Sequence, residues 1–293
     1  MPLSYSGVRD PNVTGVSSSG VSGSGVVSAV SGAVGLAPSD VANLLLWIDG
    51  TDPTKLYTAN AAASGVAVSA DGNVMGFAQS SGSLAYAAYQ ATPDKKPLYK
   101  TNIVNGKSVI RFDATDDRFS FIARVGQEIS GSILPTSDVV GAGNYTIVTS
   151  LKILSATLNS GTIYSNHRLI GDTGGYWGIY VQNVDASNVL VHAYIWDGAS
   201  KSNYVTVPKN AFSIISVTHT GTALKIRLNG GAWSEVASGN ISTLTNQVTV
   251  GDEATAKPCN MDLAGMAIFN TSISDANLLE VEKYMGNQIG LTI

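Results

Sequence analysis

One segment near the C-terminus is the most informative about the fold: Met261-Asp-Leu-Ala-Gly-Met-Ala-Ile-Phe-Asn-Thr-Ser-Ile-Ser-Asp-Ala-Asn-Leu-Leu-Glu-Val-Glu-Lys-Tyr-Met-Gly286. Its first part, 263–269, is apolar at almost every position, with only small residues at Ala264 and Gly265. Such a run has no polar face to turn toward water, so we predict a strand buried on both sides. A polar turn and a helix are expected to follow it.

The expected helix carries its own start and stop signals. The hydroxyl of Ser274 can accept a hydrogen bond from an N–H of the first turn, which makes it a suitable N-cap. Leu278, Val281 and Met285 then recur at a spacing that forms one apolar stripe, able to lie on a sheet. Gly286 is predicted to end the helix, because glycine readily adopts the left-handed conformation of a C-cap.

Composition narrows the class of protein. The chain has 293 residues, 44% hydrophobic and only 13% charged, which is enough for one large β domain or two smaller ones with a surface of Ser, Thr, Asn and Gly. The net charge of −4, without a basic run, argues against nucleic-acid binding, which requires clustered Lys and Arg. Cys259 is the only cysteine, so an intrachain disulfide is excluded.

Targeting signals are not evident in the sequence. The N-terminus lacks a basic segment followed by an apolar core, so we expect no signal peptide. No run approaches the roughly 18 apolar residues of a membrane span, so we expect no membrane insertion. We therefore expect synthesis in a cytoplasm, followed by use there or assembly into a larger structure.

The first 40 residues differ from the rest in composition. They contain Gly15-Val-Ser-Ser-Ser-Gly-Val-Ser-Gly-Ser-Gly-Val-Val-Ser-Ala-Val-Ser-Gly-Ala-Val-Gly35, which has too little side chain to form a core alone. One interpretation is a flexible linker. The other is an anchor whose valines add a strand to the sheet edge of a neighbour. We divide the chain into an arm or anchor at 1–40 and a folded domain at 41–293.

Two hairpins are predicted from Asn-Gly turns between apolar runs. The first turns at Asn105-Gly106 and the second at Asn229-Gly230, since both residue types tolerate the positive φ of a type I′ turn. In 223–228 the apolar residues alternate with Lys225 and Arg227, and we expect that charged face to meet water.

Further strands are expected from alternating or β-branched runs at 43–49, 145–154, 176–181, 188–196, 212–220 and 248–251. Roughly ten to fourteen closely spaced strands with one closing helix are typical of an antiparallel β-sandwich or jelly roll. The predicted fold class is therefore all-β, with one short C-terminal helix and an extended N-terminal arm.

Several segments resemble the concanavalin A-like lectin/glucanase superfamily, specifically the laminin G-like domains of bacteriophage and bacterial surface proteins. They are Leu45-Leu-Trp-Ile-Asp-Gly50, Pro97-Leu-Tyr99, Asn105-Gly-Lys-Ser-Val-Ile-Arg-Phe-Asp113 with Asp116-Asp117, Ala223-Leu-Lys-Ile-Arg-Leu-Asn-Gly230, and Gly265-Met-Ala-Ile-Phe-Asn270 with Ile273-Ser-Asp275 and Glu282-Lys-Tyr284. They occur in the family's order over about 41–290. The resemblance implies a concanavalin A-like sandwich and, for the lectin branch, glycan binding.

The catalytic motif of the glucanase branch, Glu-x-Asp-x-Glu on one strand, is absent. Only Glu280 and Glu282 are two residues apart, and on a helix such positions do not share a face. His167, His192 and His219 lie far apart without the spacing of a zinc site, and the latter two fit ordinary strand positions. We expect no enzyme, and keep a polysaccharide-degrading enzyme as the remote alternative.

Two weak candidate sites remain. Asp113, Asp116 and Asp117 form the densest acidic loop, which fits either calcium ligation or ordinary turn hydrogen bonds. No other cofactor is expected.

The second candidate is a sugar site, because aromatic faces stack on the apolar C–H surfaces of sugars while polar groups hold the hydroxyls. The aromatic and polar residues available for it, each of which could instead serve core packing, are Tyr176, Trp177, Trp196, Asp197 and Tyr204.

Together these features predict a non-catalytic bacteriophage virion protein, such as a tail fibre, tail-tip or capsid decoration subunit. Its partners would be other virion proteins at residues 1–40, further copies of itself, and a host surface glycan at the sandwich. The alternative is a non-viral bacterial carbohydrate-binding or adhesion module, located outside the cell or on its surface. An ordered, partner-bound arm would favour the virion over the module.

Overall fold

The computed structural model describes residues 35–59, 65–80, 86–125, 128–133, 143–155, 160–166, 177–240, 248–251 and 259–293. The span Gly35–Ile293 forms one compact unit. The predicted arm therefore lies almost entirely outside the described residues. Among the described helices, none is both long and apolar enough to cross a membrane.

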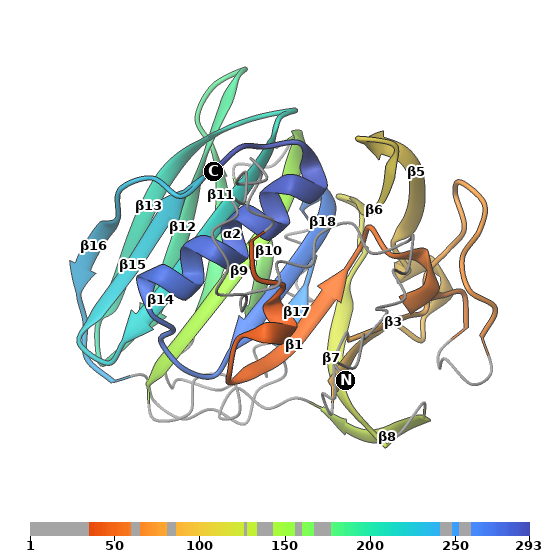
Figure 1. Ribbon diagram of the computed structural model, residues 1–293, viewed down its shortest axis with the longest axis horizontal. Coiled ribbons are helices and arrows are strands. Elements are labelled where there is room, and N and C mark those ends of the chain that lie inside the picture. Colours follow the sequence, from red (N-terminus) through yellow and green to blue (C-terminus); the bar gives the residue numbers. More distant parts are fainter. Residues whose placement is uncertain are drawn as a thin grey trace, which may run out of the picture. The chain divides into compact units, whose positions relative to one another are not determined.

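The described strands form two antiparallel sheets (Figure 1). The first sheet, in spatial order, contains β16 (Ser234–Ala237), β15 (Ala223–Leu228), β14 (Phe212–Thr220), β9 (Asn144–Ser155), β18 (Asn260–Phe269), β6 (Lys107–Asp113) and β5 (Leu98–Val104), with β1 (Leu44–Asp49) also paired to β18. The second contains β13 (Ser200–Pro208), β12 (Asn188–Trp196), β11 (Trp177–Asn183), β10 (Ser160–Asn166), β17 (Val248–Val250), β7 (Phe119–Val125), β4 (Tyr86–Tyr89), β3 (Phe77–Gln79) and β2 (Leu56–Tyr57), with β8 (Glu128–Ile133) paired to β7. Three 3-10 turns, Pro38–Asp40, Pro53–Lys55 and Pro93–Lys95, and one α-helix, α2 (Asp275–Ile289), complete the described elements.

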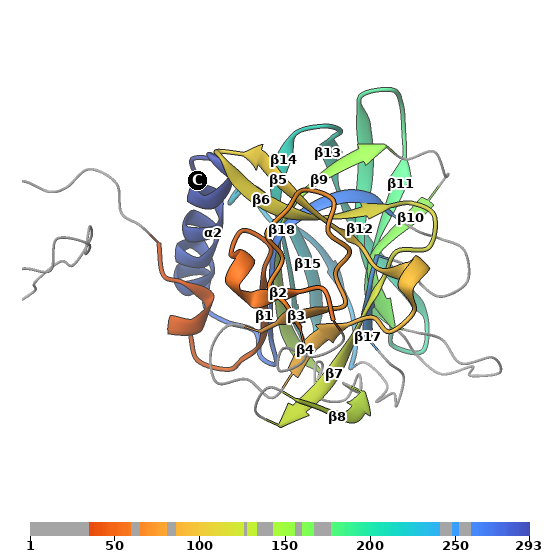
Figure 2. The same ribbon diagram turned by 90° about the vertical axis from the view of Figure 1, so that its right-hand side faces the viewer.

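The two sheets pack face to face, and α2 covers the outer side of the first sheet. Figure 2 shows α2 on one side of this unit and β10, β11 and β12 on the opposite side. The predicted all-β sandwich with one C-terminal helix is confirmed. The described strands number β1 to β18, more than the roughly ten to fourteen expected, and two of the additional ones, β2 and β3, are only two or three residues long.

Strand β18 is buried on both faces, as its apolar run predicts. Its inner residues Met261, Leu263, Met266 and Ile268 join the core between the sheets, and its outer residues Ala264, Ala267 and Phe269 join a second core beneath α2. The alternation changes phase near Gly265, where the pairing with β9 shifts register as in a β-bulge. A strand that lies between two cores needs apolar side chains on both of its faces, which explains the nearly continuous apolar run in 263–269.

Helix α2 begins as predicted but ends later. The Ser274 hydroxyl accepts from the N–H of Asn277, and Leu278, Val281 and Met285 are buried. The predicted stop at Gly286 is wrong: the helix continues to Ile289, and Gly290 is the left-handed C-cap at φ 72°. Gly286 is instead buried inside the helix, where a Cβ would come within 2.6 Å of the carbonyl oxygen of Leu291.

Both Asn-Gly hairpin turns are confirmed. Asn105 and Gly106 have φ of 48° and 71°, and Asn229 and Gly230 have φ of 51° and 68°. The expectation that the face of Lys225 and Arg227 meets water is wrong for Arg227, which is buried beneath α2 and paired with Glu282. The alternation of 223–228 is real, but the helix covers part of its polar face.

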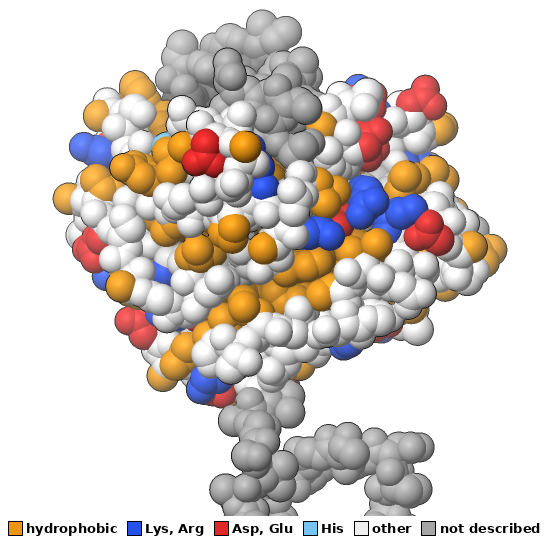
Figure 3. Space-filling model, turned by 90° about the horizontal axis from the view of Figure 1, so that it is seen from above, with side chains coloured by type: hydrophobic (Ala, Val, Ile, Leu, Met, Phe, Trp, Pro, Cys, Tyr) orange, Lys and Arg blue, Asp and Glu red, His pale blue; other side chains and the backbone are white. Residues whose placement is uncertain are grey.

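The surface is built as the composition predicts. In Figure 3 charged side chains are sparse on the visible face, and a band of hydrophobic side chains crosses it beside a group of Lys and Arg. Of the described large hydrophobic residues, those that are exposed are Leu36, Val66, Val74, Val184 and Tyr204. Tyr204 lies in the region that we consider next.

Candidate functional site

The outer face of the second sheet, over β11, β12 and β13, is the most distinctive described surface. Along β12 exposure alternates at every residue. The buried residues that point into the sandwich are Val189, Val191, Ala193 and Ile195, and the residues between them point outward. β13 alternates in the same way, and β11 does so from Ile179 to Gln182. We call this surface the aromatic face; its outward residues are Tyr180, Gln182, Asn188, Leu190, His192, Tyr194, Trp196, Ser200, Ser202, Tyr204 and Thr206.

Strand register brings the aromatic rings together. Tyr180, His192 and Tyr204 are directly opposite one another across the three strands. The His192 and Tyr204 rings lie 5.3 Å apart, measured between centroids. One pair further along β12, Tyr194 makes an edge-to-face contact with Tyr180 at 5.7 Å. Trp196 lies at the end of the same strand and is half-buried.

Uncharged polar groups complete the aromatic face. The Nε2 atom of His192 lies 3.1 Å from the Oε1 atom of Gln182, and burial lowers the pKa of His192, which keeps its ring neutral at pH 7. Ser200, Ser202 and Thr206 bring hydroxyl groups from β13. None of the outward residues of these three strands is Asp, Glu, Lys or Arg. The surface is thus aromatic and hydrogen-bonding without being ionised.

A carboxylate lies in the turn at each end of β12. Asp197, in the turn to β13, accepts hydrogen bonds from the N–H groups of Gly239 at 2.5 Å and Ala199 at 3.2 Å. Asp185, in the turn from β11, accepts from the N–H groups of Ser187 and Asn188. These backbone hydrogen bonds lower the pKa of both carboxyls, so both are ionised at neutral pH.

The predicted sugar-site residues divide between the aromatic face and the core. Trp196 and Tyr204 lie on the face, with Asp197 beside it. Both oxygens of Asp197 already accept backbone hydrogen bonds, one from Ala199 in the turn and one from Gly239 beyond β16. Trp177 is fully buried and packs 5.3 Å from the ring of Tyr145 in the core. Tyr176 lies outside the described residues.

Sequence reasoning missed Tyr180, His192 and Tyr194. His192 was expected to be an ordinary strand residue, yet it occupies the middle of the aromatic face. The signal was present in 188–196, where aliphatic residues alternate with larger aromatic and polar ones. His219 is buried instead, with Nε2 3.0 Å from the hydroxyl of Ser238, and His167 lies outside the described residues.

The acidic loop after β6 uses its carboxylates in turn hydrogen bonds. Asp113 accepts from the N–H of Thr115, and Asp117 accepts from the N–H of Asp113. Asp113 is exposed, Asp116 is half-exposed and Asp117 is buried. Within the described residues no group of three His, Cys, Asp or Glu side chains is placed to hold a metal ion. This geometry favours the turn interpretation, and calcium binding stays a prediction.

Burial of Asp117 predicts a pH-dependent stability. Its burial, with the nearby charge of Asp113, raises the pKa of the Asp117 carboxyl to about 7. The folded protein therefore binds this proton more tightly than the unfolded chain does, and the contribution to stability falls as pH rises from 4 to 7. Ionisation of Asp117 is expected to cost the folded protein about 2–4 kcal/mol at pH 8, so Asp117→Asn should raise the free energy of unfolding at that pH by this amount.

Urea unfolding at pH 5 and pH 8 measures this effect. Asp116→Asn in the same loop is the control, with a change below about 0.5 kcal/mol expected for a partly exposed residue. Equal stability of Asp117→Asn and the parent chain at pH 8 would contradict the prediction. Added calcium in the same assay tests the ion-binding alternative, because a ligand of the folded state raises the unfolding free energy.

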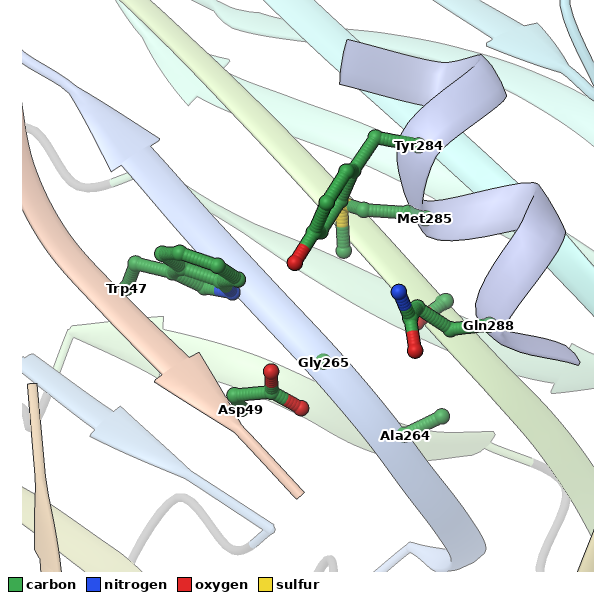
Figure 4. Close-up of a pocket in the computed structure, with 8 residues that line it drawn as sticks. Trp47, Asp49, Ala264, Gly265, Tyr284, Met285 and Gln288 are labelled. Carbon is green, nitrogen blue, oxygen red and sulfur yellow. The ribbon is translucent and has the colours of Figure 1, made fainter. Parts of the chain in front are cut away.

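A small hollow lies on the opposite side, between β1, β18 and α2 (Figure 4). Trp47 and Asp49 of β1 face Tyr284 and Gln288 of α2 across it, with Gly265 at its floor. Its volume is about 190 Å³ including open solvent, below the roughly 300–1,000 Å³ of ligand pockets. Asp49 is also occupied, since it accepts from the N–H and the hydroxyl of Thr51. The aromatic face is therefore the better candidate site.

No protein-family model and no curated protein matches this sequence. Among solved structures, the chain resembles the binding domain of botulinum neurotoxin serotype D, with a TM-score of 0.51 and 12% identity over 82% of this chain and 50% of that one. A second structure, of the receptor binding domain of botulinum neurotoxin D, gives 0.50 and 13% over 84% and 53%. The CBM40 module of the Ruminococcus gnavus IT-sialidase, bound to α2,3 sialyllactose, gives 0.40 and 18% over 50% and 86%, too distant to guide interpretation.

At this identity the likeness concerns the fold. The chain spans about half the length of the neurotoxin binding domains it resembles. The likeness supports the predicted β-sandwich fold.

Proposed function

We propose that this protein is a non-catalytic glycan-binding module, and that the aromatic face is its binding surface. The observation that carries the proposal is the outward row Tyr180, His192 and Tyr204, with Tyr194 and Trp196 beside it, on one side of a sheet. An outer sheet face does not require aromatic side chains in order to fold, although cross-strand aromatic pairs add some stability. A cluster of aromatic rings at such positions indicates a role in binding.

The chemistry of the aromatic face suits sugars. Aromatic rings offer flat apolar surfaces to the C–H faces of pyranose rings, while amide and hydroxyl groups bond the equatorial hydroxyls. The rings are held by strands paired on both sides of β12, so little conformational entropy is lost when a ligand binds. Tyr204 is 52% exposed and is the most accessible of the rings.

Substitution of the exposed rings tests the proposal. We expect Tyr204→Ala and Trp196→Ala each to weaken glycan binding about tenfold or more, as loss of about 1.4 kcal/mol of stacking and apolar contact implies. Affinity gel electrophoresis in soluble polysaccharides measures the effect. Tyr57→Ala, a half-exposed tyrosine of β2 in the same sheet, is the matched control. Equal binding by Tyr204→Ala, Trp196→Ala and the control would place the site elsewhere.

The absence of catalysis is part of the proposal. Glycoside hydrolysis requires two carboxyl groups about 5–10 Å apart on either side of the scissile bond. On the aromatic face the nearest carboxylates, Asp185 and Asp197, are in turns at opposite ends of β12. Release of reducing sugar by the pure protein, abolished by an aspartate substitution, would overturn this part.

We also propose display on a bacteriophage particle, with residues 1–40 as the anchor to other virion proteins. The support is the laminin G-like resemblance and the Gly, Ser and Val composition of the arm. The same face would serve a bacterial adhesion module equally well. Immunogold labelling of particles that encode this chain separates the two: labelled tails or capsids support the virion role, and unlabelled particles contradict it.

A further inference from the structure

We propose that the ligand of the aromatic face is an uncharged glycan chain, bound along its length rather than by one terminal sugar. This inference rests on the proposed function and specifies its substrate class. It follows from three properties of the face: its position on one side of a sheet, its dimensions and the distribution of charge around it.

The aromatic face is the outer side of three paired strands. Its rings come from the outward positions of three adjacent strands, and the described hollow lies on the other side of the sandwich. A single terminal sugar is usually recognised in a concave pocket that surrounds most of its surface. The outer side of a sheet instead contacts one side of a ligand, so affinity must come from several consecutive units.

The dimensions fit such a ligand. From His192 to Trp196 the outward positions of β12 extend over about 13 Å, since a strand rises about 3.3 Å per residue. Across the strands, Tyr180 and Tyr204 are separated by two strand spacings, or about 10 Å. The aromatic contacts therefore extend beyond one sugar ring, and a chain can reach Tyr204 and Trp196 together.

The charge distribution selects against anions. Recognition of a carboxylate or sulfate usually requires Arg or Lys, whose charge-assisted hydrogen bonds repay its desolvation. The outward positions of the three strands carry neither residue. At both ends of β12 there is an ionised carboxylate, Asp185 and Asp197, which repels an anionic ligand.

Two cations lie near these carboxylates, Lys209 near Asp185 and Lys201 near Asp197, and the charge of each contributes to the lowered pKa of its carboxyl. Lys209 lies at the Asp185 end, where its Nζ donates to the carbonyl of Asp185 and to the side-chain oxygen of Asn183 at 2.5 Å. Its charge is thus held at the turn. The face itself has hydroxyl and amide groups from Gln182, Ser202 and Thr206, which match the hydroxyls of a neutral sugar.

Affinity electrophoresis of the full chain tests the inference. The neutral probes are a mixed-linkage β-glucan, a galactomannan and a dextran, and the anionic probes are polygalacturonate and polysialic acid. We expect at least one neutral polysaccharide to retard the protein and the anionic probes to bind at least tenfold more weakly. For the polymer that binds, calorimetry with oligosaccharides of increasing length should give rising affinity until the chain spans the face, with its monosaccharide more than tenfold weaker.

Charge variants provide the matched comparison. Both Asp185→Asn and Asp197→Asn remove the charge. Asp185→Asn keeps the one oxygen that accepts from both backbone N–H groups, whereas Asp197→Asn keeps an acceptor for only one of its two. We expect both to leave binding of the neutral polysaccharide within twofold. The double variant should bind the anionic probes several-fold better than the parent does.

The outcomes distinguish this inference from the proposed function. Tight binding of an anionic probe that is lost in Tyr204→Ala would overturn the inference and retain the glycan-binding function. A monosaccharide that binds as tightly as its chain would overturn the lengthwise mode alone. Failure of every neutral and anionic probe to bind would overturn both.

Discussion

Glu282→Ala is expected to lower the free energy of unfolding by about 3–5 kcal/mol, the cost of leaving a buried charge without its partner. Glu282 of α2 is fully buried and receives two hydrogen bonds of 2.8 Å from the guanidinium of Arg227. The hydroxyl of Ser216 donates a third, at 2.5 Å. These buried hydrogen bonds connect α2 to Ser216 of β14 and Arg227 of β15. The guanidinium of Arg227 also lies 4.5 Å from the centre of the Trp233 ring.

A double variant separates charge from packing. Arg227→Met with Glu282→Leu removes both charges and keeps similar volume, and we expect its stability to lie within about 2 kcal/mol of the parent chain. Urea unfolding followed by tryptophan fluorescence measures both variants. A loss below about 1 kcal/mol for Glu282→Ala would mean that the pair behaves like an exposed one. Glycan binding by the folded variants should not change, because α2 lies on the side opposite the aromatic face.

Trp177→Ala has the second largest expected effect, a loss of about 3–5 kcal/mol in unfolding free energy, because truncation of a buried tryptophan leaves a cavity. Trp177 has no exposed surface and lies in the core between the sheets, with its ring 5.3 Å from that of Tyr145. Trp177 is three residues before Tyr180, whose side chain points outward. Because successive side chains of a strand point to opposite faces, the side chain of Trp177 points into the sandwich.

Trp196→Ala is the comparison for this prediction. Trp196 lies on the outer side of the same sheet and is only half-buried, so its loss should cost about 1 kcal/mol or less in stability while it weakens binding. In thermal unfolding Trp177→Ala should be the less stable variant, and in affinity electrophoresis Trp196→Ala should be the weaker binder. A Trp177→Ala variant of parental stability with impaired binding would return Trp177 to the candidate site.

Local features of the fold were predictable because their causes are local. The Asn-Gly turns require positive φ, which those two residues tolerate, and the structure has them at Asn105 and Asn229. The N-cap at Ser274 follows from one hydroxyl and one N–H. The end of α2 was less predictable, because Gly286 and Gly290 are equivalent as sequence signals and packing against the C-terminal residues selects Gly290.

The candidate site was only partly predictable, because it is made by register. Trp196 and Tyr204 could be identified as aromatic residues near turns, but their neighbours Tyr180 and His192 come from pairing across β11, β12 and β13. Their separation in the sequence does not indicate that Tyr180 and Tyr204 lie in line across the sheet, on either side of His192. Trp177 and Trp196 also look alike in sequence, and only the sandwich assigns one to the core.

By itself the sequence determined the strand-rich class, the hairpin turns and the closing helix, since periodicity, capping and turn preferences act over a few residues. Tertiary structure alone decided which polar residues are covered. Arg227 alternates with apolar neighbours as an exposed residue would, and it is buried because α2, about 55 positions further along the chain, lies over it. In the same way, the aromatic face exists because sheet pairing gathers side chains from three strands onto one surface, and burial and pairing are properties of the whole fold.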